Sequence, residues 1–324
     1  MRAVELREFG GPGVLRAVTA AVPEPGPGQV SVDVAWTGVN FADLKARAEG
    51  YRVPALPYVP GLEVSGRVRA LGAGVTGLAV GQEVTALTAG GAYAEVAVAD
   101  AATVFPVPDG LDLRTAASLP TVLPTAYALV HTVGRLQPGE SVLVQGAAGG
   151  VGTVVGQLAR AAGAGAVYGV VSSAAKASYA KEHGYDEVFT GDFGEAVRRA
   201  TGGRGADLVL DPVGGDTLRA GLASLAPFGR LVSFGNASSA EPWSAGQPEL
   251  YPLGLSVAGF SILTLARTAP EALRRLAAQA FAKVTDGTVS LPVTAEFALE
   301  EAAEAHRLMG GRTSTGKLLL RVAP

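Results

Sequence analysis

Residues 141–163 read SVLVQGAAGGVGTVVGQLARAAG, and this stretch decides the fold. A β-branched run enters a glycine turn and leaves through an Ala-rich segment, so we predict a strand, a tight turn and a helix. Glycine lets the backbone approach a pyrophosphate and lets the helix lie close to its strand. The helix N-terminus offers N–H groups and the positive end of its dipole to phosphates. The stretch therefore predicts a dinucleotide-binding turn.

The glycine fingerprint of such a turn falls on Ala147, Gly149 and Gly152, so alanine takes the first glycine position. The alternative is a tight turn without a ligand, and a chance match is easier in a chain with 44 glycines. The preceding strand pattern and the following helix pattern favour the binding turn. We expect five residues of the turn and the helix start to bind the cofactor: Ala148, Gly149, Gly150, Val151 and Gly152.

Beyond about residue 139, short apolar runs alternate with longer Ala-rich amphipathic segments. This alternation is typical of βαβ units and a parallel sheet. VAGFSI at 257–262 offers a further strand at the sheet edge. The other predicted strands are 141–146, 167–172, 187–190, 206–212 and 230–235, with helices near 150–163, 174–184, 192–201 and 216–226.

Residues 1–120 differ, because they are dense in Gly and Pro and their apolar runs are short. Turn signals such as PEPGPG at 23–28 indicate a β-rich domain with many turns. A chain of 324 residues exceeds the size at which one hydrophobic core usually stops growing, so we expect two domains. The C-terminal part predicts a helix at 270–286, a strand and a helix within 291–311, and a strand at 317–322.

The composition excludes several classes of protein. Apolar residues make up 48% and charged residues 17%, which indicates a folded chain with a large core. The chain contains no cysteine, which excludes disulfides, thiolate nucleophiles and cysteine-ligated zinc. A net charge of −3 without a basic run is unlike a nucleic-acid-binding protein. The N-terminal MRAVELREFGGPG lacks a secretory apolar core, and glycines break the long uncharged stretches, so we expect a cytoplasmic protein without a membrane segment.

The end of the second predicted strand bears on which nucleotide is preferred. An acidic residue there would bind a ribose 2′-hydroxyl, but the chain has Ser172, Ser173 and Lys176 and no carboxylate. Hydroxyls and an ammonium suit a 2′-phosphate through charge-assisted hydrogen bonds. A serine N-cap followed by a solvated lysine is the alternative, and both can hold together. We therefore expect NADPH to be preferred over NADH.

Motifs along the whole chain add a resemblance: VNFAD at 39–43, PGLEVSG at 60–66, GAYAE at 91–95, PTAY at 124–127, AAGGVG at 147–152, DPVGG at 211–215, SFGN at 233–236 and GGRTSTGKLLL at 310–320. Together they are similar to the medium-chain dehydrogenase/reductase superfamily, in its zinc-independent quinone oxidoreductase and zeta-crystallin branch. Zinc-dependent relatives carry Cys at the position of Asn40 and His at that of Leu62. The resemblance therefore implies a site without metal.

The resemblance implies an α/β fold in which a doubly wound parallel Rossmann sheet is inserted into a GroES-like β-barrel catalytic domain. It places the first part of the catalytic domain at 1–120, the NADPH-binding Rossmann domain at 121–265 and the rest of the catalytic domain at 266–324, with the active cleft between the domains. Relatives commonly dimerise by continuing the Rossmann sheet across an edge strand. That strand would be 256–262, so a homodimer is expected.

The same resemblance implies roles for single residues. Asn40 and Tyr51 match residues that flank the nicotinamide and the substrate, and Lys176 matches the lysine on the 2′-phosphate. A tyrosine that often helps there corresponds to Thr190. Six further positions match cofactor contacts: Thr125 by its hydroxyl, Arg312 at the 2′-phosphate, Gly235 and Asn236 at a strand end beside the cofactor, and Ser261 and Ile262 by backbone contacts to the carboxamide.

The implied activity is hydride transfer from NADPH to a small quinone or enone. Asn40 would donate a hydrogen bond to the acceptor carbonyl and Tyr51 a proton, although Asn40 also suits a turn and Tyr51 a partly buried aromatic. Glu63 matches the acid beside the zinc of relatives and could equally be a buried hydrogen-bonding group. The histidines are not spaced as ligand pairs, and we expect structural roles for them: His131, His183 and His306.

Two other functions stay open at this stage. An enoyl or 2-alkenal reductase is one, because the enoyl-reductase domains of polyketide synthases share the LTAY-like and AAGGVG patterns. The other is a crystallin-like or RNA-binding role without catalysis. The intact cofactor turn and the lack of a basic stretch argue against the second.

Overall fold

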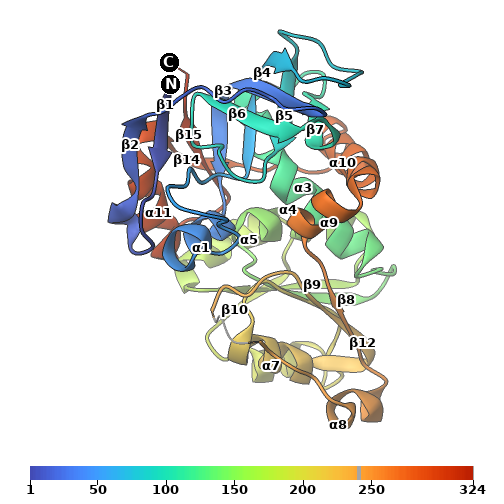
Figure 1. Cartoon of the computed structure of the whole chain (residues 1–324). Coiled ribbons are helices and arrows are strands. Elements are labelled where there is room, and N and C mark those ends of the chain that lie inside the picture. The colour runs from blue at the N-terminus through green and yellow to red at the C-terminus, as the bar shows by residue number, and fades with distance from the viewer. Residues whose placement is uncertain (239–241, 324) are drawn as a thin grey trace. The chain divides into compact units, whose positions relative to one another are not determined.

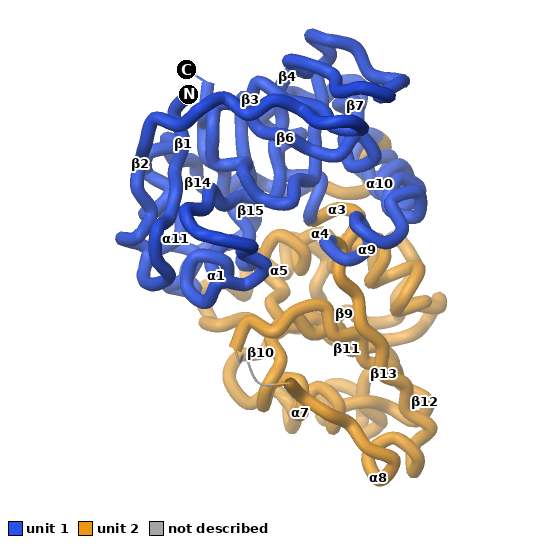
Figure 2. Tube along the Cα trace, in the orientation of Figure 1, with its two compact units in different colours: residues 1–121, 263–285, 291–324 blue, residues 122–262, 286–290 orange. Residues whose placement is uncertain are grey.

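The structure, a computed structural model, describes residues 1–238 and 242–323 and divides the chain into two compact units. Unit 1 comprises Met1–Thr121, Leu263–Thr285 and Leu291–Pro324. Unit 2 comprises Val122–Ile262 and Asp286–Ser290 (Figure 2). We had placed the domain boundaries after residues 120 and 265, with no return to the Rossmann domain at 286–290.

Segment 286–290 belongs to unit 2 because a helix side chain holds its end. The amide Nε2 of Gln157 donates to the Ser290 carbonyl at 2.8 Å, and the Ser290 N–H donates to Gln157 Oε1 at 2.9 Å. This pairing joins positions 133 residues apart, so the local sequence gives no sign of it.

Unit 2 contains a six-stranded sheet in the order β10-β9-β8-β11-β12-β13, and every neighbouring pair is parallel (Figure 1). Consecutive strands run outward from β8 in one direction, and the chain then crosses to β11 on its other side. This reversal is the topological switch point of a doubly wound sheet, so the expected Rossmann sheet is confirmed. The strands are β8 (Ser141–Gln145), β9 (Ala166–Val171), β10 (Glu187–Thr190), β11 (Ala206–Asp211), β12 (Leu225–Ser233) and β13 (Ser256–Gly259).

Helices connect these strands and bury apolar side chains against the sheet. One core cluster joins Leu143, Val209 and Leu231 of the sheet to Leu218 and Leu222. The described helices are α3 (Leu119–Tyr127), the π-helix η3 (Ala128–Thr132), α4 (Gly150–Ala161), α5 (Ala177–Glu182), α6 (Gly194–Ala200), α7 (Gly215–Ala223) and α8 (Gln247–Leu250), with short 3-10 turns η4 (Ala174–Lys176) and η5 (Tyr251–Leu253).

Two strands differ from the prediction by more than one residue. β12 begins at Leu225 rather than at 230, because Leu225 already pairs with Ala206 of β11. After a register shift Arg230 pairs with Leu208, so the PFG sequence at 227–229, where Phe228 has φ +63°, lies inside the strand. The predicted edge strand 257–262 ends at Gly259, because Ile262 already begins helix α9 (Ile262–Thr268).

Unit 1 is built on the eleven-residue strand β3 (Gln29–Val39), which pairs antiparallel with three strands along its length. The sheet runs in the order β14-β15-β3-β4-β5-β7, with β6 also on β3, and β1 pairs with β2 separately. The strands from both ends of the chain thus meet on β3. They are β1 (Arg2–Glu5), β2 (Arg16–Thr19), β4 (Glu63–Leu71), β5 (Glu83–Leu87), β6 (Val96–Asp100), β7 (Val104–Pro106), β14 (Val293–Ala298) and β15 (Lys317–Arg321).

Helices in unit 1 pack against its strands. The first of these helices, α1 (Phe41–Glu49), was not predicted from the sequence. It follows β3 directly, with Asn40 as its N-cap and Gly50 in the left-handed conformation at its C-cap. Its Leu44 joins the unit 1 core beside Val39. The remaining helices are α2 (Leu113–Ala116), α10 (Pro270–Thr285) and α11 (Ala302–Gly310), with 3-10 turns η1 (Pro12–Val14), η2 (Ala101–Thr103) and η6 (Leu299–Glu301).

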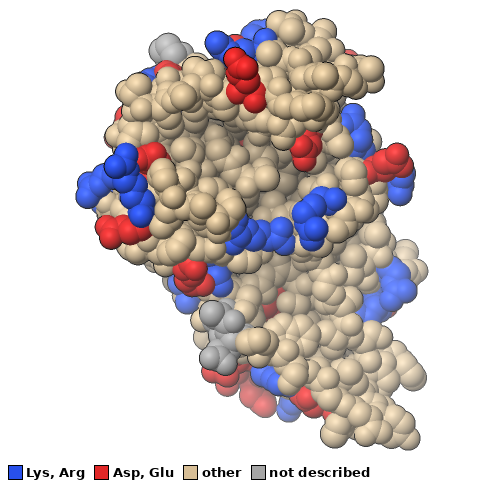
Figure 3. Space-filling model, in the orientation of Figure 1, with Lys and Arg blue, Asp and Glu red and all other residues tan. Residues whose placement is uncertain are grey.

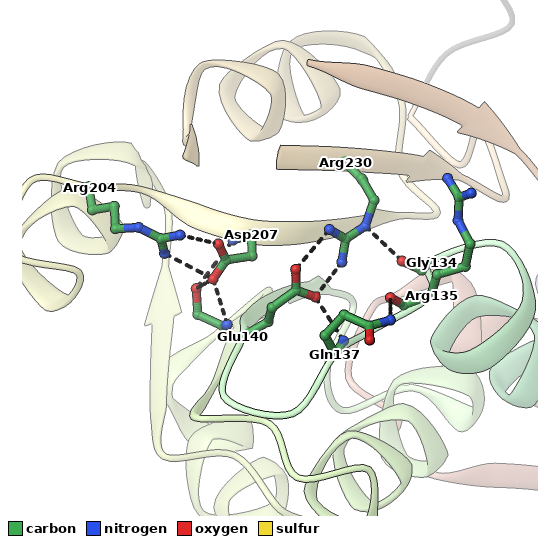
Figure 4. Close-up of polar contacts among 8 residues, drawn as sticks. Gly134, Arg135, Gln137, Glu140, Arg204, Asp207 and Arg230 are labelled. Carbon is green, nitrogen blue, oxygen red and sulfur yellow. Dashed lines mark hydrogen bonds and ion pairs between the residues drawn. The ribbon is translucent and has the colours of Figure 1, made fainter. Parts of the chain in front are cut away.

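An ion pair joins the loop before β8 to β12 in unit 2 (Figure 4). The Arg230 guanidinium bonds both carboxylate oxygens of Glu140, at 2.9 and 2.5 Å, and also the Gly134 carbonyl at 2.8 Å. Burial raises the pKa of Glu140, but the hydrogen bonds from Arg230 and the Gln137 N–H outweigh it and lower that pKa overall. The partly buried pair therefore ties two segments 90 residues apart.

Charged side chains are spread thinly over the surface. On the face shown in Figure 3, Lys and Arg stand singly or in small groups beside Asp and Glu, and most of the surface is uncharged. Within residues 1–238 and 242–323, no helix combines the length and apolarity that crossing a bilayer requires.

Candidate active site

The glycine turn between β8 and α4 has no space for side chains at its closest point. A Cβ on Gly152 would lie 2.3 Å from the Gly146 carbonyl oxygen and 2.7 Å from the Ala147 Cα. The first N–H groups of a helix have no partner within it, so those of Gly150 to Gly152 point out of the helix start. The Gly149 N–H instead donates to the Gly146 carbonyl at 3.0 Å. The turn thus has the backbone cradle and helix N-terminus that a diphosphate requires.

Alanine at the first fingerprint position is accommodated by a glycine on the next strand. Ala147 is fully buried, and a Cβ on Gly169 of β9 would lie 2.8 Å from the Ala147 methyl carbon. The methyl group at position 147 therefore takes space that Gly169 leaves. The departure from the glycine fingerprint is compensated inside the sheet.

The residues expected at the 2′-phosphate lie together at the end of β9. Ser172 and Ser173 are exposed, and Lys176 closes the 3-10 turn η4 that Ser173 precedes. Thr190, the last residue of β10, pairs in register with Val171, so it lies at the same sheet edge. These groups form a polar, accessible corner with one cation.

The loops after β11 and β12 contact each other through backbone. Gly214 has φ +76°, and a Cβ there would lie 2.0 Å from Asn236 Oδ1, whereas one on Gly235 would lie 2.5 Å from the Pro212 carbonyl. Asp211 Oδ1 accepts the N–H groups of Val213 and Gly214, both at 2.7 Å. Gly235 and Asn236 are therefore held at the carboxyl edge of the parallel sheet.

The other expected cofactor residues belong to several elements. Ser261 and Ile262 follow β13 at the carboxyl edge, and Thr125 is buried in α3. Arg312 lies in unit 1 after α11, is exposed and has φ +57°. Within unit 2, the glycine turn, the β9 corner, Gly235, Asn236 and Ser261 thus all follow carboxyl ends of neighbouring strands, where ligands of doubly wound sheets bind.

Asn40 is fixed at three atoms at the junction of β3 and α1. Its backbone N–H donates to Asp43 Oδ2 at 2.8 Å, and Asp43 caps the helix in this way. Its side-chain Nδ2 donates to Glu63 Oε1 at 2.8 Å, and its Oδ1 accepts from Lys317 Nζ at 2.7 Å. Asn40 is therefore an ordered N-cap rather than a loop turn.

Glu63 and Lys317 form an ion pair at 2.5 Å, with the side chains 0% and 3% exposed. The second carboxylate oxygen of Glu63 accepts the Thr121 N–H at 2.9 Å. The sequence reasoning treated Glu63 as a buried hydrogen-bonding group and did not single out Lys317. The one signal for Lys317 was a lysine at the start of an otherwise apolar strand.

Asp43, Tyr93 and His306 form a second buried polar group next to Asn40. Burial raises the pKa of Asp43 to about 7 despite hydrogen bonds from backbone N–H groups and the charge of Lys317. The Tyr93 hydroxyl bonds His306 Nε2 at 3.0 Å and also Asp43, and burial raises its pKa. Burial and the Arg47 charge lower the pKa of His306 to about 3, so this ring is neutral. The expected structural role of His306 agrees with this buried bond.

Tyr51 lies at the opposite end of α1 from Asn40. Nine helical residues separate them, which corresponds to roughly 14 Å along the axis. Tyr51 is 41% exposed, and its hydroxyl accepts a hydrogen bond from Arg52 Nε at 3.2 Å. The two residues expected to be catalytic thus lie in one unit without contacting each other.

The donors around Asn40 do not fit a zinc ion. Zinc prefers Cys, His and carboxylate ligands, and Asn40 and Leu62 are none of these. The carboxylate that contacts the side chain of Asn40, Glu63, is already paired with the ammonium group of Lys317. Throughout the described residues, no group of three or more His, Cys, Asp or Glu side chains is arranged to hold a metal.

Comparison with known proteins places the chain in a family. Residues 26–109 match the alcohol dehydrogenase GroES-like domain, and residues 150–278 match the zinc-binding dehydrogenase family. The chain is 35% identical to a quinone oxidoreductase of Pseudomonas aeruginosa, over 98% of both chains. It belongs to the zinc-independent quinone oxidoreductase family of medium-chain dehydrogenases/reductases.

This member of the quinone oxidoreductase family is an oxidoreductase, and the GroES-like and Rossmann fold class expected from the sequence is confirmed. The crystal structure of Escherichia coli quinone oxidoreductase complexed with NADPH has 31% sequence identity and a TM-score of 0.93, and the match covers 99% of this chain and 100% of that one. A mycocerosic acid synthase-like polyketide synthase of Mycolicibacterium smegmatis is 33% identical over 95% of this chain, which spans 15% of that protein.

Proposed function

We propose that this protein is an NADPH-dependent quinone oxidoreductase that transfers hydride to a quinone or related conjugated carbonyl without a metal. The observation that carries the proposal is the glycine turn at Gly146 to Gly152, where the start of α4 lies so close to the turn that a Cβ on Gly152 would meet the Gly146 carbonyl oxygen at 2.3 Å. The family membership and the relative described with NADPH support the same reading.

The cofactor residues of the proposal are those that follow strand ends in unit 2. Backbone N–H groups of Ala148, Gly150, Val151 and Gly152 would hold the diphosphate, with Gly149 providing clearance. Lys176 with Ser172 and Ser173 would bind the 2′-phosphate, and Arg312 would add a second cation. The nicotinamide side would contact Thr125, Gly235, Asn236, Ser261 and Ile262.

The bound reduced nicotinamide would supply the hydride. The protein then has to position the acceptor and donate to the oxygen that becomes basic. Asn40 suits the first role, because its amide is ordered at both heteroatoms. Tyr51 suits proton donation, because its hydroxyl is accessible.

The nucleotide assignment is tested by calorimetric titration of NADPH and NADH. Lys176→Met removes the cation at the end of β9, and we expect NADPH affinity to fall about tenfold while NADH affinity stays the same. Lys181→Met, at an exposed lysine of α5, is the matched control. Wild-type protein that prefers NADH would refute the NADPH assignment.

The second candidate function is reduction of a 2-enoyl thioester or 2-alkenal. The similarity to a polyketide synthase over almost the whole chain favours it. The two functions share the cofactor site and differ in the acceptor. A panel of quinones, 2-enoyl thioesters and 2-alkenals, compared by kcat/KM with NADPH, separates them.

We also propose a cytoplasmic homodimer. Strand β13 lies at the end of the Rossmann sheet, with a free edge in the order of strands. Phe228 and Tyr251 are 80% and 77% exposed. Tyr251 shortly precedes β13 in the sequence, and Phe228 lies against Gly254, where a Cβ would be 2.9 Å from the phenyl ring. An exposed edge with large apolar side chains suits continuation of the sheet by a second copy.

The dimer is tested by sedimentation equilibrium. The wild type should have twice the 32.6 kDa chain mass, and the double variant Phe228→Asp, Tyr251→Asp should have the monomer mass. A wild-type monomer at micromolar concentration would rule the homodimer out.

A further inference from the structure

The buried ion pair of Lys317 and Glu63 is not explained by stability alone. Removing two charges from water costs free energy that their attraction only partly returns, so buried ion pairs are weak contributors to stability. What such a pair provides is a fixed pattern of donors and acceptors. Here that pattern faces a single side chain, Asn40.

Strand pairing brings the three residues together. β15 runs antiparallel to β3 with Leu318 opposite Val39, so Lys317 comes next to Asn40. Glu63 begins β4 on the other side of β3, and its carboxylate crosses the strand at Gly38, where a Cβ would lie 2.2 Å from Oε1. The resulting triangle has sides of 2.5, 2.7 and 2.8 Å.

The triangle permits only one orientation of the Asn40 amide. An ammonium only donates and a carboxylate only accepts, so Oδ1 must face Lys317 and Nδ2 must face Glu63. A flipped amide would place Oδ1 against the carboxylate and Nδ2 against the ammonium. An amide nitrogen has two N–H donors, and Glu63 uses one.

We propose that Lys317 is a positioning residue that fixes the Asn40 amide so that its second N–H is offered to the carbonyl oxygen of the acceptor. The inference rests on the proposed quinone reduction for its chemical purpose. The orientation of the amide itself does not depend on that function. Lys317 acts through Asn40 and does not touch the acceptor.

The orientation is tested by nuclear magnetic resonance, independently of activity. The chain has two asparagines, Asn40 and Asn236, so selective ¹⁵N-asparagine labelling gives two side-chain amide signals. Asn40→Ala assigns them. In Lys317→Met the Asn40 signal should shift and its amide protons should exchange faster with water, while the Asn236 signal stays and Lys317→Arg resembles the wild type. An unchanged Asn40 signal in Lys317→Met would overturn the proposal; if this variant does not fold, Lys317→Gln serves for the same measurement.

Kinetics test whether the effect passes through Asn40. With a quinone acceptor, Lys317→Met should lower kcat about tenfold, leave the Kd for NADPH unchanged, and be largely rescued by Lys317→Arg. In an Asn40→Ala background the same substitution should have no further effect, since interacting residues are non-additive. Equal losses in both backgrounds would refute positioning through Asn40. A wild type that reduces no quinone would defeat the proposed function, whereas the amide signals would still decide the orientation.

Discussion

Arg52 Nε donates a 3.2 Å hydrogen bond to the hydroxyl oxygen of Tyr51, and the guanidinium lies 5.6 Å from the centre of the tyrosine ring. Arg52 is itself held by Thr264, whose Oγ1 accepts from its Nη2 at 2.8 Å. Because the phenol oxygen already accepts this bond, its own O–H is directed away from Arg52. Such an arrangement prepares the hydroxyl to donate.

Tyr51→Phe should therefore lower kcat for a quinone by about tenfold or more if the phenol donates the proton. Arg52→Ala should cause a smaller loss in the same direction, since it removes only the group that orients the hydroxyl. Steady-state kinetics at saturating NADPH measure both. Arg7→Ala, at an exposed arginine outside the site, is the control. Wild-type rates in Tyr51→Phe would exclude Tyr51 as the donor.

Gly152→Ala should weaken nucleotide binding, because the added methyl group would meet the Gly146 carbonyl oxygen at 2.3 Å. Backbone cannot yield as a flexible side chain can, so the turn or the helix start has to shift. Gly194→Ala, at the start of α6 away from the turn, is the matched control, because its Cβ would have 3.6 Å to the nearest atom. We expect Gly152→Ala to lose roughly tenfold or more in NADPH affinity by calorimetry. Equal affinities in the two variants would contradict the close approach.

Much of unit 2 could be predicted from sequence, because each strand of a parallel sheet is a short apolar run and each connection a longer amphipathic segment. The strand, turn and helix at 141–163 follow from local pattern. The missed helix α1 had local signals too: Asn40 and Asp43 are spaced as a capping pair, and Gly50 suits a C-cap. We had weighed Asn40 as a donor to the acceptor carbonyl against a turn residue after a strand, and had not considered a helix cap there.

The sequence predicted those site residues that lie close together in the chain or within family motifs. It did not predict contacts between distant parts of the chain. Asn40 and Lys317 are 277 positions apart, and only the pairing of β15 with β3 brings them together. The compensation of Ala147 by Gly169 likewise depends on sheet register. The roles of Asn40 and Tyr51 and of the cofactor residues stay predictions that the experiments above address.

Thr190→Tyr should raise the preference for NADPH over NADH. Thr190 lies in register beside Val171 at the exposed end of β10, next to the serines after β9. The family resemblance implies a tyrosine at this position. A phenol there would reach further and donate to the 2′-phosphate. The ratio of kcat/KM for the two nucleotides should change several-fold. Thr190→Phe, which adds the ring without the hydroxyl, should leave the ratio near the wild-type value, and an equal gain in both would attribute the effect to stacking.

Glu140→Gln should destabilise unit 2 at neutral pH by about 1.5–3 kcal/mol, the usual contribution of a hydrogen bond to a charged group. The pKa of Glu140 is lowered in the folded protein. Its contribution is therefore present above the unfolded pKa and is lost as pH falls through the folded pKa. Urea unfolding of wild type and variant should differ at about pH 7 and converge under acid. A difference independent of pH would show that the carboxylate charge is not responsible.

Asp43→Asn tests the buried acid behind Asn40. Burial raises the pKa of Asp43 to about 7, so the folded state binds its proton more tightly than the unfolded chain does. The stability it contributes is fully present below the unfolded pKa of about 4 and is lost as pH rises through about 7. The charged or titratable groups that face it are Glu63, Lys317, Tyr58 and Tyr93. Arg47 and His306 interact with Tyr93 in turn.

The free energy of unfolding of the wild type, relative to Asp43→Asn, should therefore decrease between about pH 4 and about pH 7 and stay level above that. The asparagine can still accept the Asn40 N–H, so the cap is preserved and the comparison isolates the titration. Urea unfolding at several pH values measures the difference. Asp109→Asn, at an exposed acid, should show no such trend. Parallel pH curves for wild type and Asp43→Asn would mean that Asp43 keeps one protonation state throughout, and the neutral buried carboxyl would have to be abandoned.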